Sequence, residues 1–346
     1  HDDAPSAVEA IRSMRRREVL RLAMAGIVHV GSMAELSRGL TDITTASLRA
    51  FLAVAQRDQM PSIEFSVIAM GRYGGAELGF GSDADVLFVY RGNEQDPEVA
   101  RKVAEIISSR MTEYVADARL ALELDLDLRP EGRNGPNVRS LESYRTYYDR
   151  WSLTWEAQAL LRAAPVAGSP ELLADFMALV DTVRYQADLP ESEIREVRRI
   201  KARIESERLP QGADPTRHLK LGRGSLSDVE WTVQLLQLQH GAEHPQLQSP
   251  VTLDALDAAT KLELITSADA RKLSEAWIFA SRIRSAMTLW AQRSNDVLPT
   301  DITDLNGIAR LLDYPRGGAS QLEEDYLSTT RRARSVVERI FYGIQK

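Results

Sequence analysis

A chain of 346 residues exceeds the usual size of one compact core, so its length predicts at least two packed units. Hydrophobic residues make up 44% of the chain and charges of both signs are mixed, which excludes the disordered and fibrous classes and indicates an ordinary globular protein. The net charge of −7 provides no basic field for a nucleic-acid backbone, and the lack of cysteine excludes disulfides, zinc–thiolate sites and thiol nucleophiles, which leaves oxygen atoms as ligands for a hard cation.

The chain also lacks the sequence features of a membrane or secreted protein. No apolar run approaches the roughly 18 to 20 residues that cross a membrane. Residues 1–27 carry arginines but neither the apolar block nor the cleavage site of a signal peptide. We therefore expect a cytoplasmic protein with neither a membrane nor a nucleic acid as partner. Because the chain starts at His1 rather than methionine, we also expect it to be a piece of a longer polypeptide.

The first part of the chain combines helical and strand patterns. Apolar residues at helical spacing predict helices, and short apolar runs rich in β-branched and aromatic residues predict strands. In chain order these are helices over 7–28 and 33–57, strands over 64–70 and 83–90, and a helix over 97–117. A break at Met60 and Pro61 precedes the first strand. The connection between the two strands is rich in glycine, with Gly71, Gly74, Gly75, Gly79 and Gly81.

A third strand is predicted over 120–129, where every second residue is leucine. The residues between the leucines are Ala121, Glu123, Asp125, Asp127 and Arg129. One face of this strand is therefore apolar and the other is charged.

The remainder of the chain shows only helical periods after a loop rich in glycine and proline over 130–136. Helices are expected over 191–209, 225–240 and 270–294, with polar breaks at 245–250 and 299–304, as in a helical bundle. The sequence thus predicts an α+β fold. Its expected domains are N-terminal helices over 1–60, a small mixed sheet with flanking helices over 61–168, and an all-helical bundle over 169–346.

Three carboxylates suggest the chemistry. Asp83 and Asp85 open the second strand and are two residues apart, so they project from the same side of the sheet. The acidic face over 120–129 would lie beside them if the two strands pair. Nucleotidyl transfer needs fixed charge that neutralises phosphate and orients attacker and leaving group, which two metal ions about 3.5 to 4 Å apart supply. Uncompensated carboxylates would repel one another, so we expect Mg²⁺ here and predict a metal-dependent nucleotidyltransferase.

Each part of this pattern also has a plainer explanation. An isolated Asp-x-Asp usually lies in a solvated loop, although the surrounding strands and glycine-rich turn favour a metal site here. Spacing alone cannot choose among Glu123, Asp125 and Asp127, because neighbours on one face lie about 6.5 to 7 Å apart. Arg129 is either a phosphate ligand or a salt partner of the acidic face. The glycines let backbone N–H groups approach a triphosphate, but the segment lacks the Gly-Lys-Ser/Thr ending of a Walker loop.

Four segments of the chain, taken in order, carry a family signature. They are GRYGGAELGFGSDADVLFVY (71–90), ELDLDLRPEGRNGP (123–136), WSLTWEAQALLRA (151–163) and GRGSLSDVEWTVQLLQL (222–238). Together they resemble the glutamine synthetase adenylyltransferases, and the resemblance extends from RRREVLRLA (15–23) to the terminal helix. It implies a nucleotidyltransferase catalytic domain of the polymerase-β-like type over 61–168, followed by the helical bundle.

The resemblance also assigns site residues. Asp83 and Asp85 match the family's metal-binding pair, and Asp125 matches the acid of its third strand, which makes these three the expected catalytic and metal-binding residues. The residues expected near the nucleotide are Gly71, Arg72, Gly81, Ser82 and Arg129. Arg72 stands where lysine or a small residue is common, and Gly79 and Gly81 replace the more usual asparagine and serine. The segment Asp228–Trp231 matches a family segment that is either structural or in contact with the site.

In this family, one half of a long bifunctional polypeptide transfers AMP from ATP to a tyrosine of glutamine synthetase, and the other half removes it by phosphorolysis. The segment Leu153–Arg162 and the ending at Phe341 and Tyr342 look more like the C-terminal, adenylylating half. The resemblance therefore implies AMP transfer with release of pyrophosphate, two Mg²⁺ ions, and down-regulation of nitrogen assimilation. The alternatives are the deadenylylating half, which releases ADP, and a non-catalytic module that senses nucleotide or the PII signal protein. The helical region would dock the protein substrate.

Overall fold

The computed structural model describes residues 3–59, 63–92, 96–151, 153–207, 209 and 214–344. It divides into two compact units. The first comprises His1–Leu78 with Ser82–Arg184, and the second comprises Gly79–Gly81 with Tyr185–Lys346. The expected break at Met60 and Pro61, and the domain boundary placed there, lie outside the described residues, as does Arg208 near the end of the helix expected over 191–209. In the described part of the chain, no helix is both long and apolar enough to span a membrane.

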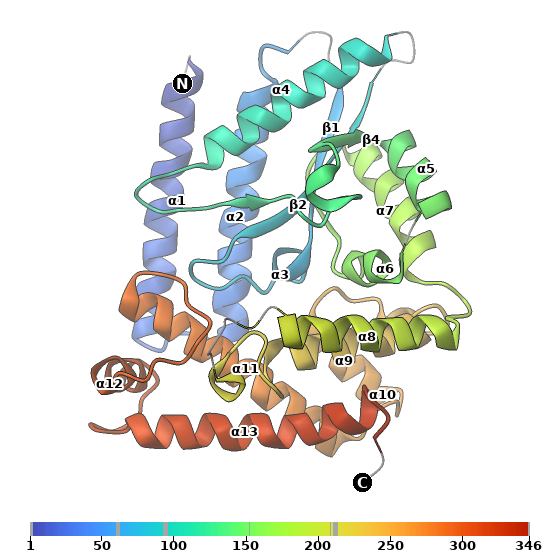
Figure 1. Cartoon of the computed structure of the whole chain (residues 1–346). Helices are drawn as coiled ribbons and strands as arrows, with labels where there is room; N and C mark the ends of the chain where they lie inside the picture. Colours follow the sequence, from blue (N-terminus) through green and yellow to red (C-terminus); the bar gives the residue numbers. More distant parts are fainter. Residues whose placement is uncertain are drawn as a thin grey trace. The chain divides into compact units, whose positions relative to one another are not determined.

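Two long helices begin the first unit, as the sequence predicts. Helix α1 (Ala4–Ile27) starts at Asp3, whose side chain accepts the N–H of Ser6 at 2.8 Å. Helix α2 (Met33–Gln56) starts with a capping box in which Ser32 and Glu35 accept each other's backbone N–H groups. The two helices pack along each other (Figure 1). These caps satisfy N–H groups that a helix start leaves without partners, which explains why the helices begin where they do.

A small mixed sheet forms the core of the first unit (Figure 1). Strand β1 (Glu64–Ala69) pairs antiparallel with β2 (Ala84–Arg91) on one side and with β5 (Ala164–Gly168) on the other. The outer edge of β2 pairs in parallel with two short strands, first β3 (Leu124–Asp125) and then β4 (Val138–Ser140). The expectations of a small mixed sheet and of strands over 64–70 and 83–90 are therefore confirmed.

Further helices and turns complete the first unit around this sheet. Helix α4 (Pro97–Val115) contacts α2 and β4, and α7 (Pro170–Arg184) contacts β1 and β5. The remaining elements are α3 (Gly71–Gly74), a 3₁₀ turn at Gly132–Asn134, α5 (Leu141–Trp151) and α6 (Thr154–Leu160).

The strand expected from the alternating leucines is much shorter than predicted. Only two residues of it, the strand β3, join the sheet. Before β3, the backbone carbonyls of Leu120 and Ala121 accept hydrogen bonds from the guanidinium of Arg15 on α1, at 2.7 and 3.2 Å, instead of from a neighbouring strand. After β3, the carboxylate of Asp125 accepts the N–H of Asp127 at 2.7 Å, which turns the chain. Alternation predicted the buried side correctly at Leu122 and Leu124 but could not reveal these competing hydrogen bonds.

The expectation that only helices follow residue 136 is wrong at β4 and β5. Strand β4 has three residues, too few for a period of two to show, and β5 consists of alanine, proline, valine and glycine, which are mostly poor strand formers. Both become strands because the edges of β2 and β1 offer hydrogen-bond partners.

The second unit is helical, as predicted (Figure 1). Its helices are α8 (Glu191–Glu207), α9 (Leu226–His240), α10 (Thr252–Lys261), α11 (Ser267–Ala291), α12 (Ile302–Leu311) and α13 (Ala319–Ile340), with 3₁₀ turns at Pro215–Arg217 and Pro245–Leu247. Helices α9, α11 and α13 contact one another, and α12 contacts α11 and α13.

A buried ionic cluster joins three helices of this unit. Asp228 on α9 has no exposed surface and accepts Nζ of Lys201 on α8 at 2.7 Å and Nη1 of Arg334 on α13 at 2.9 Å. It also accepts the backbone N–H of Gly224 at 2.6 Å. Burial raises the pKa of Asp228, but the charges of Lys201 and Arg334 overcome this and hold the pKa below its ordinary value. The sequence left two roles open for the segment that starts at Asp228, a structural one and a contact with the site. The buried ion pairs favour the structural role for Asp228.

The turn before α9 requires glycine for two reasons. Gly224 has a φ of +75°, and a Cβ built on it would lie 1.9 Å from the carbonyl oxygen of Thr330. Gly317 offers a matched control in the same unit, because its φ of +77° is similar but nothing lies within 4 Å of its built Cβ.

We predict that Gly224→Ala destabilises the protein more than Gly317→Ala does. Backbone strain at a positive φ costs about 1 to 2 kcal/mol in both variants. The overlap with Thr330 adds roughly 1 to 3 kcal/mol in Gly224→Ala alone. Urea unfolding of the two variants measures the difference, and equal losses of unfolding free energy would contradict the tight approach of Gly224 to α13.

Candidate functional site

Two carboxylates meet where β2 pairs with β3. The parallel register places Asp85 opposite Asp125 and Ala84 opposite Leu124, and the N–H of Ala84 donates to the carbonyl of Glu123 at 2.9 Å. Residues paired across neighbouring strands point to the same face of the sheet, and the strands lie about 4.8 Å apart. Both carboxylates are half-buried. The pairing of the two acidic strands, on which the metal-site hypothesis depends, is therefore present.

The register also separates the three acids that spacing could not. Asp127 lies in the turn after β3, where its carboxylate accepts Nε of Arg133 at 2.7 Å. Glu123 is exposed and lies before the first paired residue. Asp125 is the one paired with Asp85, which favours it as the partner of that carboxylate.

Asp83 lies just before β2 and is exposed. Among the described residues, no group of three or more acidic or histidine side chains is arranged to hold a metal ion. The geometry thus brings together Asp85 and Asp125, and the participation of Asp83 stays a prediction.

The glycine-rich connection comes directly against Asp85. Gly71 begins α3 with a φ of +51°, and a Cβ built on it would lie 2.2 Å from Oδ2 of Asp85. Only glycine therefore allows the backbone to pass this close to the carboxylate. Carboxylate oxygens are ligands that suit Mg²⁺, and glycine backbone lets a phosphate group approach, so both properties are found together at this turn.

The other residues expected near the nucleotide are placed differently from one another. Arg72 donates Nε to the carbonyl of Glu77 at 3.0 Å, Ser82 is half-buried, and Gly81 belongs to the second unit with a φ of +70°. Arg129 is buried, and its three guanidinium nitrogens donate to the carbonyls of Gly135, Leu126 and Arg133. Arg129 thereby fixes its own loop, and its contact with phosphate stays a prediction.

Sequence reasoning did not single out a buried ion pair beside this site. Arg162 donates Nε to the carbonyl of Gly71 at 2.9 Å and forms an ion pair with Glu77. The available signal was that both are charged residues inside segments of the family signature. Spacing could not find the pair, because its two members lie on separate segments of the chain.

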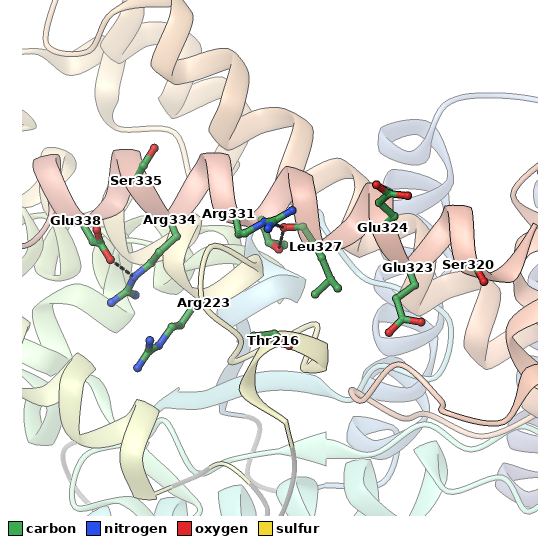
Figure 2. Close-up of a pocket in the computed structure, with 11 residues that line it drawn as sticks. Thr216, Arg223, Ser320, Glu323, Glu324, Leu327, Arg331, Arg334, Ser335 and Glu338 are labelled. Atoms are coloured by element: carbon green, nitrogen blue, oxygen red, sulfur yellow. Dashed lines mark hydrogen bonds and ion pairs between the residues drawn. The ribbon is translucent and has the colours of Figure 1, made fainter.

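A cavity of about 670 Å³ lies elsewhere, against α13 in the second unit (Figure 2). None of the predicted site residues lines it. Acidic residues (Glu323, Glu324, Glu338) and basic residues (Arg331, Arg334) of α13 both line it, and Figure 2 shows Arg334 paired with Glu338, 3.4 Å apart. This mixture of charges provides no uniform field for a triphosphate, so the carboxylates of the sheet remain the better candidate.

Two family models match the chain. The model of glutamate-ammonia ligase adenylyltransferase matches residues 1–179, and the model of GlnD PII-uridylyltransferase matches residues 198–341. The similar curated proteins are bifunctional glutamine synthetase adenylyltransferase/adenylyl-removing enzymes. That of Leifsonia xyli subsp. xyli is 57% identical over 99% of this chain and 34% of its own length. That of Cutibacterium acnes is 46% identical over 99% of this chain and 35% of its own. The chain spans about a third of the length of these relatives.

We predict that Mg²⁺ raises the melting temperature of the wild type and of Asp127→Asn but not of Asp125→Asn. Asparagine keeps the hydrogen bond from residue 127 to residue 125, so Asp125→Asn removes charge while the turn is preserved. Asp127 already has Arg133 as its partner and serves as the matched control. Thermal unfolding with and without Mg²⁺ measures the effect, and a loss in Asp127→Asn instead would assign the ligand to that residue.

Proposed function

Because the chain belongs to the glutamate-ammonia ligase adenylyltransferase family, we propose that it transfers AMP from ATP to a tyrosine of glutamine synthetase, with release of pyrophosphate. The observation that carries this proposal is the register of Asp85 with Asp125 beside the backbone of Gly71. It combines what nucleotidyl transfer needs, namely adjacent carboxylates for a cation and a backbone that a phosphate can approach.

In the proposed mechanism, Asp83, Asp85 and Asp125 hold Mg²⁺. A bound ion would supply positive charge that neutralises the triphosphate and would make a nearby phenol more acidic. The turn at Gly71 lets the phosphates lie close to the backbone, and Asp85 and Asp125 would fix the position of the cation beside them. The phenolic oxygen of the tyrosine forms a bond to this phosphorus, the bond to the bridging oxygen breaks, and pyrophosphate leaves with the electron pair. A carboxylate oxygen of Asp125 takes the phenolic proton, which a phenol of pKa about 10 does not release readily at neutral pH.

We further propose that the sheet region over 61–168 is a catalytic domain of the polymerase-β-like type, supported by the N-terminal helices over 1–60. The helical region over 169–346 would dock glutamine synthetase. Support for a docking role comes from the match of residues 198–341 to a PII-uridylyltransferase, an enzyme whose name also specifies a protein substrate. The same match makes PII a candidate regulator at these helices.

The reverse activity is a second candidate, because the relatives' names include an adenylyl-removing enzyme. In that case the same carboxylates would direct orthophosphate to the AMP-tyrosine, and ADP would be released. The segment Leu153–Arg162 looks more like the adenylylating half, which is why we place AMP transfer first.

We predict that the chain labels unmodified glutamine synthetase when it is incubated with Mg²⁺ and ATP labelled at the α-phosphate. Asp83→Asn and Asp85→Asn should each reduce this labelling at least about a hundredfold, since each removes charge where the transition state needs it. Asp257→Asn is the control, because Asp257 pairs with Lys261 on the surface of α10. The label on tyrosine is located by mass spectrometry.

A parallel reaction supplies AMP-modified glutamine synthetase with orthophosphate. Release of ADP there, without labelling in the first reaction, would assign the deadenylylating activity instead. Binding of Mg²⁺ and ATP with neither reaction would indicate a nucleotide-sensing module. Equal labelling by the wild type and Asp85→Asn would exclude the proposed site.

A further inference from the structure

A buried ion pair lies next to the turn at Gly71, the turn whose backbone approaches Asp85. Arg162 and Glu77 are 5% and 3% exposed, and their side chains form an ion pair inside the first unit. Nε of the same guanidinium donates to the carbonyl of Gly71 at 2.9 Å. Arg162 therefore connects the first residue of α3 with an acid that lies just after this helix.

The backbone on both sides of this contact is fixed by the sheet. Arg162 follows α6 and precedes β5, whose first residue, Ala164, pairs with Ala69 at the end of β1. Helix α3 leaves from that same end of β1. A Cβ built on Gly74 would lie 1.7 Å from the carbonyl oxygen of Arg162, so the two segments are in direct backbone contact.

Glu77 is fixed as well. Its backbone N–H donates to the carbonyl of Arg72 at 2.8 Å, and its own carbonyl accepts Nε of Arg72 at 3.0 Å. These two hydrogen bonds join Arg72 in α3 to Glu77 and so fix the turn between them. The backbone of Glu77 is therefore constrained, and its carboxylate contacts Arg162 in a fixed geometry.

A buried ion pair contributes little to stability compared with apolar side chains of the same volume, because both charges lose their hydration. A role in fixing the position of a nearby group therefore explains such an ion pair better than a contribution to stability does. The position fixed here is that of Gly71, whose backbone lies against the Asp85 carboxylate.

We propose that Arg162 and Glu77 are positioning residues that hold the Gly71 turn beside Asp85 and thereby set the affinity for the phosphate groups of a nucleotide. The proposal rests on the proposed function in that the ligand is ATP. Arg162 acts on the carbonyl of Gly71, and Glu77 acts by orienting Arg162.

The test measures binding of ATP with Mg²⁺ by calorimetry in the wild type, Arg162→Lys and Glu77→Gln. Lysine keeps the charge but has a single nitrogen, which cannot serve Glu77 and the Gly71 carbonyl in the same geometry. Glutamine keeps the shape of Glu77 and removes its charge. We expect ATP binding to weaken about ten- to a hundredfold in both variants, because small misplacements of a phosphate site carry penalties of this order. The double variant should be no weaker than either single variant, since the two residues act as a unit.

Arg184→Lys is the matched control for structural damage. Arg184 is also buried in the first unit and donates to the carbonyls of Leu160 and Ala163, on either side of Arg162. Its replacement loosens the same segment while the hydrogen bond from Arg162 to the carbonyl of Gly71 is kept. We expect Arg184→Lys to lower the melting temperature as much as Arg162→Lys while ATP binding is kept.

Unchanged ATP binding in folded Arg162→Lys and Glu77→Gln overturns the proposal, and so does equal weakening by Arg184→Lys. If the wild type binds ATP but neither transfers AMP nor releases ADP, the proposed function is wrong and the positioning role of Arg162 and Glu77 can still hold. A wild-type chain that does not bind ATP overturns both.

Discussion

The parallel pairing of β2 with the two residues of β3 is the contact on which the candidate site depends, because it alone sets Asp85 opposite Asp125. So short a pairing cannot hold its own register, and two arginines stabilise the chain around it. Arg15 from α1 donates hydrogen bonds to the carbonyls just before β3, and Arg129 donates to carbonyls of the loop after it. The first helix of the chain thereby contributes to the position of a carboxylate more than a hundred residues later.

Buried charge serves different ends in the two units. In the second unit Asp228 gathers Lys201 and Arg334, so that helices α8, α9 and α13 share one fully buried carboxylate. A charge in that position is tolerated only because it is paired and because the Gly224 N–H adds a further bond. In the first unit the pair of Arg162 and Glu77 lies behind a turn instead of between helices, and its guanidinium points at a backbone carbonyl of the site.

Local patterns predicted the elements whose own composition decides their structure. The long helices and the strands β1 and β2 follow from apolar spacing and from β-branched residues. The strand expected from alternating leucines shows the limit of this reasoning, because alternation reports which side chains are buried and not which partner the backbone finds. At Leu120 and Ala121 that partner is an arginine from α1. Strands β4 and β5 were missed for the complementary reason, since the edges of β2 and β1 impose strand structure on segments with little preference for it. The ion pair of Arg162 with Glu77 was beyond reach because its members lie far apart in the sequence.

Asp83 and Asp85 are equal in the sequence pattern but unequal in the structure. Asp85 lies inside the ladder, paired with Asp125 and bounded by the backbone of Gly71. Asp83 lies before the first paired residue and is exposed. A cation shared by the two would therefore join a half-buried carboxylate to an exposed one, whose side-chain rotamer freedom is lost on binding. The conformational entropy lost at Asp83 lowers the affinity, so the part of the site around Asp85 has to be well positioned for a cation and nucleotide to bind at all. Gly71, held in place by Arg162, meets that requirement.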